Sequence, residues 1–326
     1  MKRVALSLVL AAGIATSAMA ADMATKAPPA PPAPPPSPWD IAITAALMTD
    51  YNWRGITQSG HHPSAQAGFE PRYNFNANWQ GYVGISGESI DFPNRAAAEI
   101  DLYGGIRPTF DKLAMDFGFW YYWYPGGQCF NSTISTCYSN LPNGNAAVAD
   151  ASFYEWYAKA TYTVNENLAF GGQFYYSPNV LNTGAPGEYY TGNITLTAPS
   201  AWFWSGWGGY LSADVGYWNL GSSNSFYCTQ NASGSACASP YSSGIPYESY
   251  WNWDVGVGFT YKAFTLDLRY YDTNLNKGNC NAFTSDQTAG GSSNVTAINP
   301  GGTGSNWCSA TFIAKLSFAT NLSSIK

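Results

Sequence analysis

Apolar and polar side chains alternate along most of this chain, most strictly between residues 251 and 261. One set of positions is apolar or aromatic and the other is polar or glycine: Trp251, Trp253, Val255, Val257, Phe259 and Tyr261 against Asn252, Asp254, Gly256, Gly258 and Thr260. Successive side chains of an extended strand point to opposite faces, whereas an amphipathic helix repeats about every 3.6 residues. The segment is therefore predicted to be a strand with one apolar face and one polar face.

About twelve runs of this kind follow one another, each close to the ~9–11 residues that a tilted membrane strand needs. The predicted strands are residues 39–53, 65–74, 79–89, 98–110, 113–124, 153–164, 168–177, 189–198, 208–219, 251–261, 264–273 and 310–320. Connections after even-numbered strands are mostly short, whereas those after odd-numbered strands are generally longer and rich in Gly, Ser, Asn and Pro. Outer-membrane barrels have this asymmetry between periplasmic turns and external loops. The sequence predicts an all-β fold, a single antiparallel transmembrane barrel of about twelve strands.

The composition favours a barrel in lipid over a soluble β-sandwich, which the strand pattern alone leaves open. Charged residues make up 10% of the chain, against about 25% in an ordinary soluble domain. Aromatic residues reach 17%, with 24 Tyr and 13 Trp, and these rings concentrate where lipid meets water. Beyond residue 20 no apolar run approaches the ~18 residues of a membrane helix. The net charge of −6 disfavours nucleic acid as a partner.

The first residues have the pattern of an export signal. Lys2 and Arg3 precede an apolar run that ends in Ala18-Met19-Ala20, so we expect a signal peptide over residues 1–20. Residues 21–38 are rich in proline, which cannot donate in a sheet, and are expected to form a periplasmic linker. The barrel domain is then expected over residues 39–326.

Six cysteines in an exported chain indicate disulfides rather than metal ligands. Each of three pairs lies within one hydrophilic connection, which favours local bridges: Cys129 with Cys137, Cys228 with Cys237 and Cys280 with Cys308.

The segment Asp50-Tyr51-Asn52-Trp53-Arg54-Gly55-Ile56-Thr57-Gln58-Ser59 resembles the Asp-Tyr-x-x-Arg-Gly-Ile-Ser/Thr-Gln-Ser signature of the TorF family of proteobacterial putative porins. Ile100-Asp101-Leu102-Tyr103-Gly104-Gly105 and Tyr122-Trp123-Tyr124-Pro125 support the resemblance. The chain departs from the expected pattern in its long cysteine-bearing loops and its non-aromatic end. The resemblance implies an outer-membrane barrel with a pore and no defined solute.

The alternation assigns a set of charged residues to the interior of the barrel. The acids are Asp50, Glu70, Glu88, Glu99, Asp101, Asp116, Glu155, Asp214, Asp254 and Asp267, and the bases are Arg54, Arg72, Arg107, Lys159, Arg269 and Lys315. If water fills the interior, these residues line a pore with a mild cation preference, because carboxylates lower the barrier for cations. Alternatively, the charges pair with one another across a barrel of modest width and close it.

Two local features complete the expectations. His61 and His62 are expected to lie at a solvated loop tip, although Asp50 nearby could imitate the site of an outer-membrane hydrolase. Arg54 is expected near the outer mouth, in a bidentate pair with Glu70 or Glu88 on a neighbouring strand. The alternative is an exposed, unpaired arginine at the rim. No catalytic residue, cofactor or metal is predicted.

The predicted function is passive diffusion of small hydrophilic solutes or ions through the outer membrane. The predicted partners are these solutes and the lipid bilayer with its lipopolysaccharide. The alternatives are a structural or adhesive barrel with disulfide-closed loops and, less favoured, a hydrolase.

Overall fold

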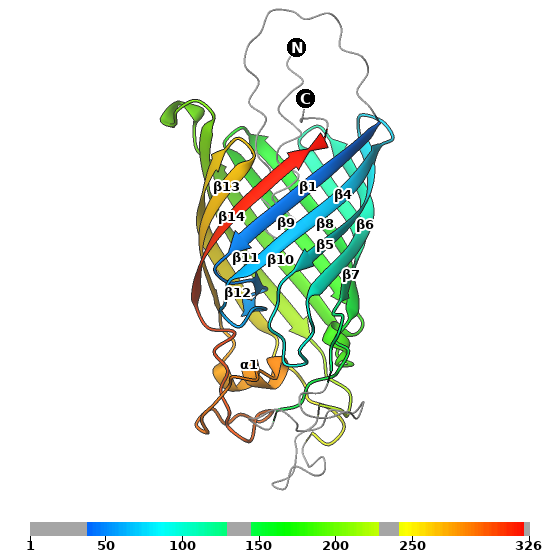
Figure 1. Ribbon diagram of the computed structural model, residues 1–326, viewed down its shortest axis with the longest axis vertical. Coiled ribbons are helices and arrows are strands. Elements are labelled where there is room, and N and C mark those ends of the chain that lie inside the picture. Colours follow the sequence, from blue (N-terminus) through cyan, green and yellow to red (C-terminus); the bar gives the residue numbers. More distant parts are fainter. Residues whose placement is uncertain (1–37, 129–144, 228–240, 323–326) are drawn as a thin grey trace, which may run out of the picture.

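A computed structural model of the protein describes residues 38–128, 145–227 and 241–322. Antiparallel strands close into one barrel in the order β1-β14-β13-β12-β11-β10-β9-β8-β7-β6-β5-β4 (Figure 1). The barrel strands are β1 (Trp39–Met48), β4 (Ser64–Asn74), β5 (Trp79–Glu88), β6 (Glu99–Phe110), β7 (Leu113–Trp123), β8 (Phe153–Asn165), β9 (Leu168–Ser177), β10 (Gly187–Thr197), β11 (Trp207–Leu220), β12 (Tyr250–Tyr261), β13 (Phe264–Thr273) and β14 (Thr311–Asn321). The predicted twelve-stranded antiparallel barrel is confirmed.

The first predicted strand is too long. It was expected to run to Trp53, but β1 ends at Met48 and the chain then leaves the wall. Residues 49–63, here called loop 1, contain a small hairpin of β2 (Asn52–Trp53) and β3 (Ile56–Thr57). The hairpin turns because Arg54 and Gly55 adopt left-handed backbone angles, with φ of 53° and 82°.

In the predicted first strand, the alternation places Trp53 on the face that meets lipid. In the structure Trp53 faces inward instead. Its ring lies 4.8 Å from the ring of Trp218 and 5.8–5.9 Å from the rings of Tyr122 and Phe153. Loop 1 thus enters the outer part of the barrel and packs on side chains of its interior face.

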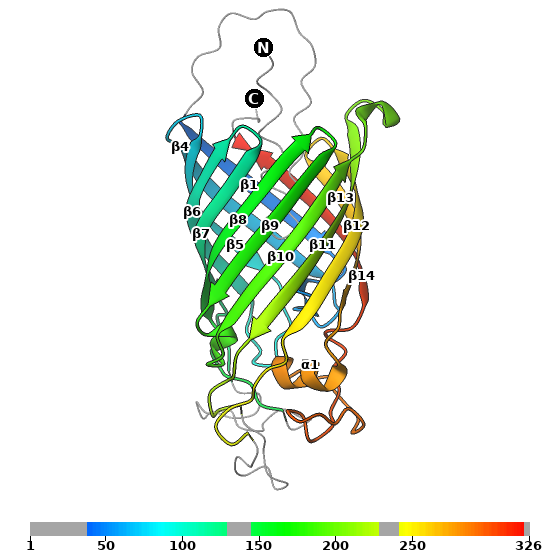
Figure 2. The same ribbon diagram turned by 180° about the vertical axis from the view of Figure 1, so that it is seen from behind.

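The two ends of the barrel differ, as the connection lengths predicted. Short turns join the strands at one end, and the longer connections gather at the other end together with α1 (Lys277–Thr284) (Figures 1 and 2). By the rule that short turns face the periplasm, the end that carries α1 is the outer end. No sequence pattern indicated α1, which begins after Asn276. The side chain of Asn276 accepts a hydrogen bond from the backbone N–H of Asn279.

Cys280, within α1, and Cys308 form the predicted disulfide, with Cα atoms 6.0 Å apart. The predicted pairs Cys129–Cys137 and Cys228–Cys237 lie outside the described residues. The predicted signal peptide and all of the predicted linker except Pro38 also lie outside them.

Large apolar side chains cover the outside of the wall. Val83, Leu102, Val255 and Leu316 are each more than two-fifths exposed, although they lie within long strands. Such a surface is unfavourable in water but suits a hydrocarbon core, in which every backbone polar group must be paired, as it is in a closed barrel. The protein is therefore a membrane-spanning barrel of the outer-membrane type, not a soluble sandwich. Among the described residues, no helix is long and apolar enough to cross a membrane.

Tyrosine rings inside the barrel lie over glycines of neighbouring strands. A Cβ atom at Gly84 would collide with the ring of Tyr103, and one at Gly258 would collide with the ring of Tyr210. The missing side chain leaves room for the ring to lie flat against the wall. This pairing accounts for part of the unusual content of glycine and tyrosine.

Candidate functional site: the barrel interior and its outer mouth

The charged residues that the alternation assigned to the interior all lie on that side of the wall or in loop 1. Most are less than a tenth exposed, whereas Arg72, Asp214 and Asp254 are more accessible. The strands hold them at fixed heights because one residue in two points inward. They form several separate clusters, which are described in turn from the turn end to the outer mouth.

Arg107 on β6 is the centre of the first cluster. Its Nη1 and Nη2 donate to the two carboxylate oxygens of Glu70 at 2.6 and 3.0 Å, and its Nε donates to Asp116 at 3.0 Å. Arg72 also donates to Glu70, at 2.5 Å. The ring of Tyr82 lies 3.5 Å from the Arg107 guanidinium carbon, and its hydroxyl donates to Asp116. The cluster is a compact network of charge-assisted hydrogen bonds.

Arg269 on β13 organises a second cluster on another part of the wall. Its guanidinium donates to Asp254, to Asp267 at 3.0 Å and to the hydroxyl of Ser212 at 2.6 Å. Tyr210 donates to Asp267 at 2.7 Å. As in the first cluster, carboxylates hold an arginine, and a tyrosine hydroxyl donates to one of these carboxylates, so each cluster is polar but largely neutralised.

Three further charged residues of the wall, Asp214, Lys159 and Lys315, lie outside these two clusters. Asp214 accepts a hydrogen bond from the hydroxyl of Thr191. The Lys159 ammonium lies over the rings of Tyr157 and Tyr175, at 4.3 and 5.3 Å from their centroids. Lys315 donates to the side-chain oxygen of Gln66 at 3.3 Å.

Arg54 sits at the outer mouth and crosses the lumen. Its Nη1 and Nη2 donate to the two oxygens of Glu155 at 2.9 and 2.6 Å, which makes a bidentate pair with both side chains almost fully buried. Tyr122 donates to the same carboxylate at 3.1 Å. The predicted geometry of the pair is right, but the predicted partners, Glu70 and Glu88, are wrong.

The partner was missed because loop 1 turns inward after Met48. This carries Arg54 away from the strands beside β1 and across the mouth to β8, which is five strands away around the wall. Four aromatic rings surround the guanidinium with centroids 4.3–5.0 Å from its carbon: Trp53, Tyr175, Tyr189 and Trp218. The hydroxyl of Tyr250 donates to the backbone oxygen of Arg54 at 2.9 Å. No sequence pattern pointed to this aromatic cage.

His61 is only partly solvated: its side chain is 35% exposed, and two hydrogen bonds hold the ring. Its Nδ1 lies 2.8 Å from Asp50 Oδ2, and its Nε2 lies 3.1 Å from the backbone oxygen of Asn306, in the connection before β14. Both neighbours are acceptors, so both ring nitrogens are placed to donate, which favours the imidazolium form. The hydrogen bond to Asp50 is the main cause that raises the pKa of His61 above its ordinary value. His62, in contrast, is largely exposed.

The hydroxyls near Asp50 do not complete a catalytic triad. Thr57 and Ser59 both donate to Asp50 Oδ1, not to the imidazole. In a Ser-His-Asp hydrolase the nucleophilic hydroxyl bonds to the imidazole nitrogen that faces away from the carboxylate. Here that nitrogen faces the Asn306 carbonyl. The arrangement fastens loop 1 and has no activated nucleophile.

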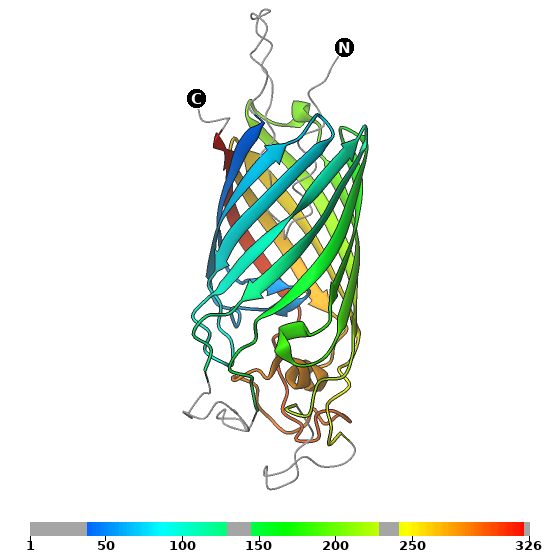
Figure 3. The ribbon, with the colours of Figure 1, turned by 90° about the vertical axis from the view of Figure 1, so that its right-hand side faces the viewer.

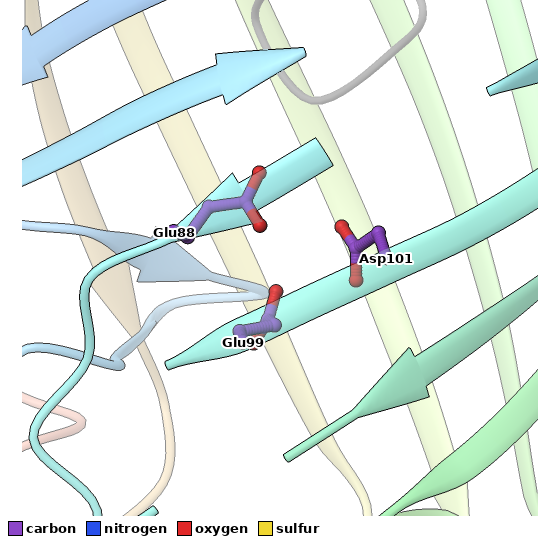
Figure 4. Close-up of side chains that lie close together, drawn as sticks. All are labelled: Glu88, Glu99 and Asp101. Atoms are coloured by element: carbon purple, nitrogen blue, oxygen red, sulfur yellow. The ribbon is translucent and has the colours of Figure 1, made fainter. Parts of the chain in front are cut away.

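Three carboxylates meet at the outer ends of β5 and β6. Glu88 lies opposite Glu99 in the strand register, and Asp101 points inward two residues further along β6. Figure 4 shows the three groups pointing toward one another, and one oxygen from each lies within 4.8 Å of the others. The sequence placed each residue in the interior but not the three together, although the antiparallel pairing of the two predicted strands could have indicated it. They are called the carboxylate trio below.

The outer connections converge over the mouth (Figure 3). A cavity of about 60 Å³ lies between them, with a mainly apolar lining that includes Trp53, Ile56, Phe92, Phe283 and Trp307. Segments from several different connections therefore meet above the Arg54 cage.

Residues 32–173 match the model of a family described as bacterial protein of unknown function (Gcw_chp). No curated protein matches the sequence. Among solved structures, the NanC porin is 9% identical, with a TM-score of 0.41 over 85% of this chain and 98% of that one. LpxR from Salmonella typhimurium is 8% identical, with a TM-score of 0.38 over 85% and 99%. A loop-deletion mutant of OmpT, an outer membrane protein of Vibrio cholerae, is 11% identical, with a TM-score of 0.34 over 86% and 98%. Likenesses this distant carry no argument about function.

Proposed function

We propose that this protein is a narrow outer-membrane channel for small hydrophilic solutes or ions, with an outer mouth that loop 1 closes in the conformation described above. The observation that carries the proposal is the contrast between the two faces of the wall. Apolar side chains cover the outside, whereas charged groups and hydroxyls recur inside from the Arg107 cluster to the outer mouth. The resemblance to the TorF porins, which implies a pore, supports the same proposal.

Loop 1 supports a gated passage rather than a permanently open one. It is held by side-chain contacts from Arg54, His61 and Tyr51, and no disulfide among the described residues ties it down. Contacts of this kind can break and re-form without unfolding the wall. The excess of interior acids over bases supports a mild preference for cations.

A structural or adhesive barrel is the second candidate, because the Arg107 and Arg269 clusters are internally paired and help to fill the interior. We do not propose an enzyme. The hydroxyls of Thr57 and Ser59 are turned away from the imidazole of His61, which is placed to donate from both nitrogens.

Planar-bilayer recordings of the purified full chain test the proposal. We expect small current steps, long closed periods and a reversal potential that favours cations in a salt gradient. A variant in which loop 1 is replaced by a short Gly-Ser turn should be open for longer. If neither protein gives current steps while both migrate as folded barrels, the channel is refuted and the structural role takes its place.

A further inference from the structure

We infer that the carboxylate trio of Glu88, Glu99 and Asp101 is a binding site for a divalent cation of the calcium type. The three side chains are 2%, 2% and 4% exposed. None of them forms an ion pair with an arginine or lysine among the described residues. Three buried carboxylates in contact repel one another unless protons or a cation compensate their charge.

The orphaned oxygens are the second observation. Glu88 Oε2 and Asp101 Oδ1 are buried and have no hydrogen-bond partner. A buried acceptor without a partner is costly, and most such groups in native proteins have a protein, water or ion partner. Both residues belong to the group whose ligand oxygens converge on one point (Figure 4). Two of the three members of the trio therefore carry unused bonding capacity.

The other carboxylate oxygens are already held in position. Gln66 donates to Glu88 Oε1 at 2.7 Å, and Ser86 donates to Asp101 Oδ2 at 3.2 Å. Tyr51 and Tyr124 donate to the two oxygens of Glu99 at 2.6 and 2.9 Å. Such partners orient metal ligands and reduce the rearrangement that binding requires.

The donor set and the spacing select the type of ion. All three ligands are carboxylates, which suit hard cations rather than zinc or copper. Oxygens up to 4.8 Å apart fit around an ion with bonds of about 2.3–2.6 Å better than around magnesium, which requires about 2.0–2.1 Å in a strict octahedron. One divalent ion would neutralise two of the three negative charges of the trio.

The carboxylate trio is also connected to loop 1. Tyr51 belongs to loop 1, and its hydroxyl bonds to Glu99 of the trio. A cation on Glu99 would therefore fix the carboxylate to which loop 1 is anchored. This inference does not depend on conduction, because a structural barrel could hold the same ion.

Terbium luminescence tests the site directly. The purified full chain in detergent, freed of metal with a chelator, is titrated with Tb³⁺ while its aromatic residues are excited. Tyr51 and Tyr124 contact a ligand of the site, so we expect saturable sensitised emission that Ca²⁺ displaces at lower concentration than Mg²⁺. Emission without saturation, or displacement by both ions at equal concentration, would overturn the assignment.

Variants locate the ion. The double variant Glu88→Gln with Asp101→Asn should lower the Tb³⁺ and Ca²⁺ affinity at least tenfold. Asp254→Asn removes an interior carboxylate of the Arg269 cluster and should leave the affinity unchanged. Saturable emission that survives in the double variant would place the ion elsewhere and refute the site.

A measurement on the unaltered protein guards against a variant that fails to fold. The midpoint of heat-induced loss of barrel migration should rise with Ca²⁺ and fall with chelator, since an ion that binds only the folded state stabilises it. A midpoint that Ca²⁺ and chelator leave unchanged, in a protein that migrates as a folded barrel, would contradict the inference.

Discussion

The guanidinium of Arg54 and the carboxylate of Glu155 form a bidentate ion pair across the outer mouth, although 101 residues separate them in the chain. Glu155 is 1% exposed, and the aromatic cage of four rings described above shields Arg54 from water. The pair therefore fastens loop 1 to the far wall in a site where a lone charge is strongly disfavoured.

Replacing Arg54 with Ala should release loop 1, because Glu155 would be left as a buried charge without its counter-ion. Breaking a buried pair in this way costs about 3–5 kcal/mol. We expect faster protease cleavage within loop 1 and larger or longer openings in planar bilayers. Arg54→Lys keeps the charge but loses the bidentate contact. Its cleavage rate and its channel openings should therefore be intermediate between those of the unaltered protein and Arg54→Ala. Unchanged cleavage and conductance in Arg54→Ala would show that the pair does not hold the loop.

The contact between His61 and Asp50 should make loop 1 sensitive to pH. Since the folded pKa of His61 is raised, its stabilising contribution is complete below about pH 6.5, the ordinary pKa, and is lost as the pH rises through the folded value. Amide hydrogen exchange in loop 1, corrected for the intrinsic effect of pH, should therefore be slower at pH 5.5 than at pH 8.5. His61→Gln should abolish this difference, whereas His62→Gln should keep it. A pH dependence that survives in His61→Gln would assign the effect to another group.

Arg107 should contribute more to the stability of the barrel than any single exposed charge. Its removal leaves Glu70 and Asp116 together in the interior without the cation that bridges them. We expect Arg107→Ala to lower the free energy of unfolding by about 3–5 kcal/mol in urea titrations of the reconstituted protein. Lys262→Ala, in a turn, is the matched control and should change it by less than about 0.5 kcal/mol. Equal effects of the two changes would argue that the Arg107 cluster is dispensable.

The disulfide between Cys280 and Cys308 should hold the outer connection that contains α1, not the wall. Both sulfurs are buried beside Phe283 and Trp307, and the bridge spans 28 positions of the chain. The double variant Cys280→Ser with Cys308→Ser should still migrate as a folded barrel, but the segment between the two positions should be cleaved much faster. Loss of the folded barrel band in this variant would show that the connection also supports the strands.

The outer face should tolerate a charge only near its edges. Val255 lies in the middle of β12 and faces outward, so Val255→Arg should cost about 2–4 kcal/mol in a bilayer. Tyr261 closes the same strand on the same face, and Tyr261→Arg should cost about 0–1 kcal/mol for the charge itself. Unfolding in lipid vesicles measures both. Equal costs would be inconsistent with a hydrocarbon layer centred on the strand.

The wall could be predicted because each of its residues obeys a local rule. Val255 must face lipid and Asp254 must not, so apolar and polar residues alternate in the sequence.

Loop 1 was mispredicted because Tyr51 and Trp53 continue this alternation after the chain has left the wall. Only the backbone angles at Arg54 and Gly55 mark the point where it leaves. The partner of Arg54 was missed because alternation specifies a face but not which residue lies across the lumen. The helix α1 was missed because Gly278 and three Asn or Thr residues are weak helix formers, and its disulfide and packing stabilise it instead.

The position of Arg54 inside the barrel also determines when loop 1 can dock during barrel assembly. Loop 1 leaves the ribosome early, between β1 and β4, yet its cage is built from β8, β9, β10 and β11, and Tyr250 of β12 holds its backbone. The guanidinium has no binding position until those strands are paired side by side in the wall. A partly inserted barrel must therefore keep its first loop outside the lumen, and docking of Arg54 becomes a late event that reports completion of the wall.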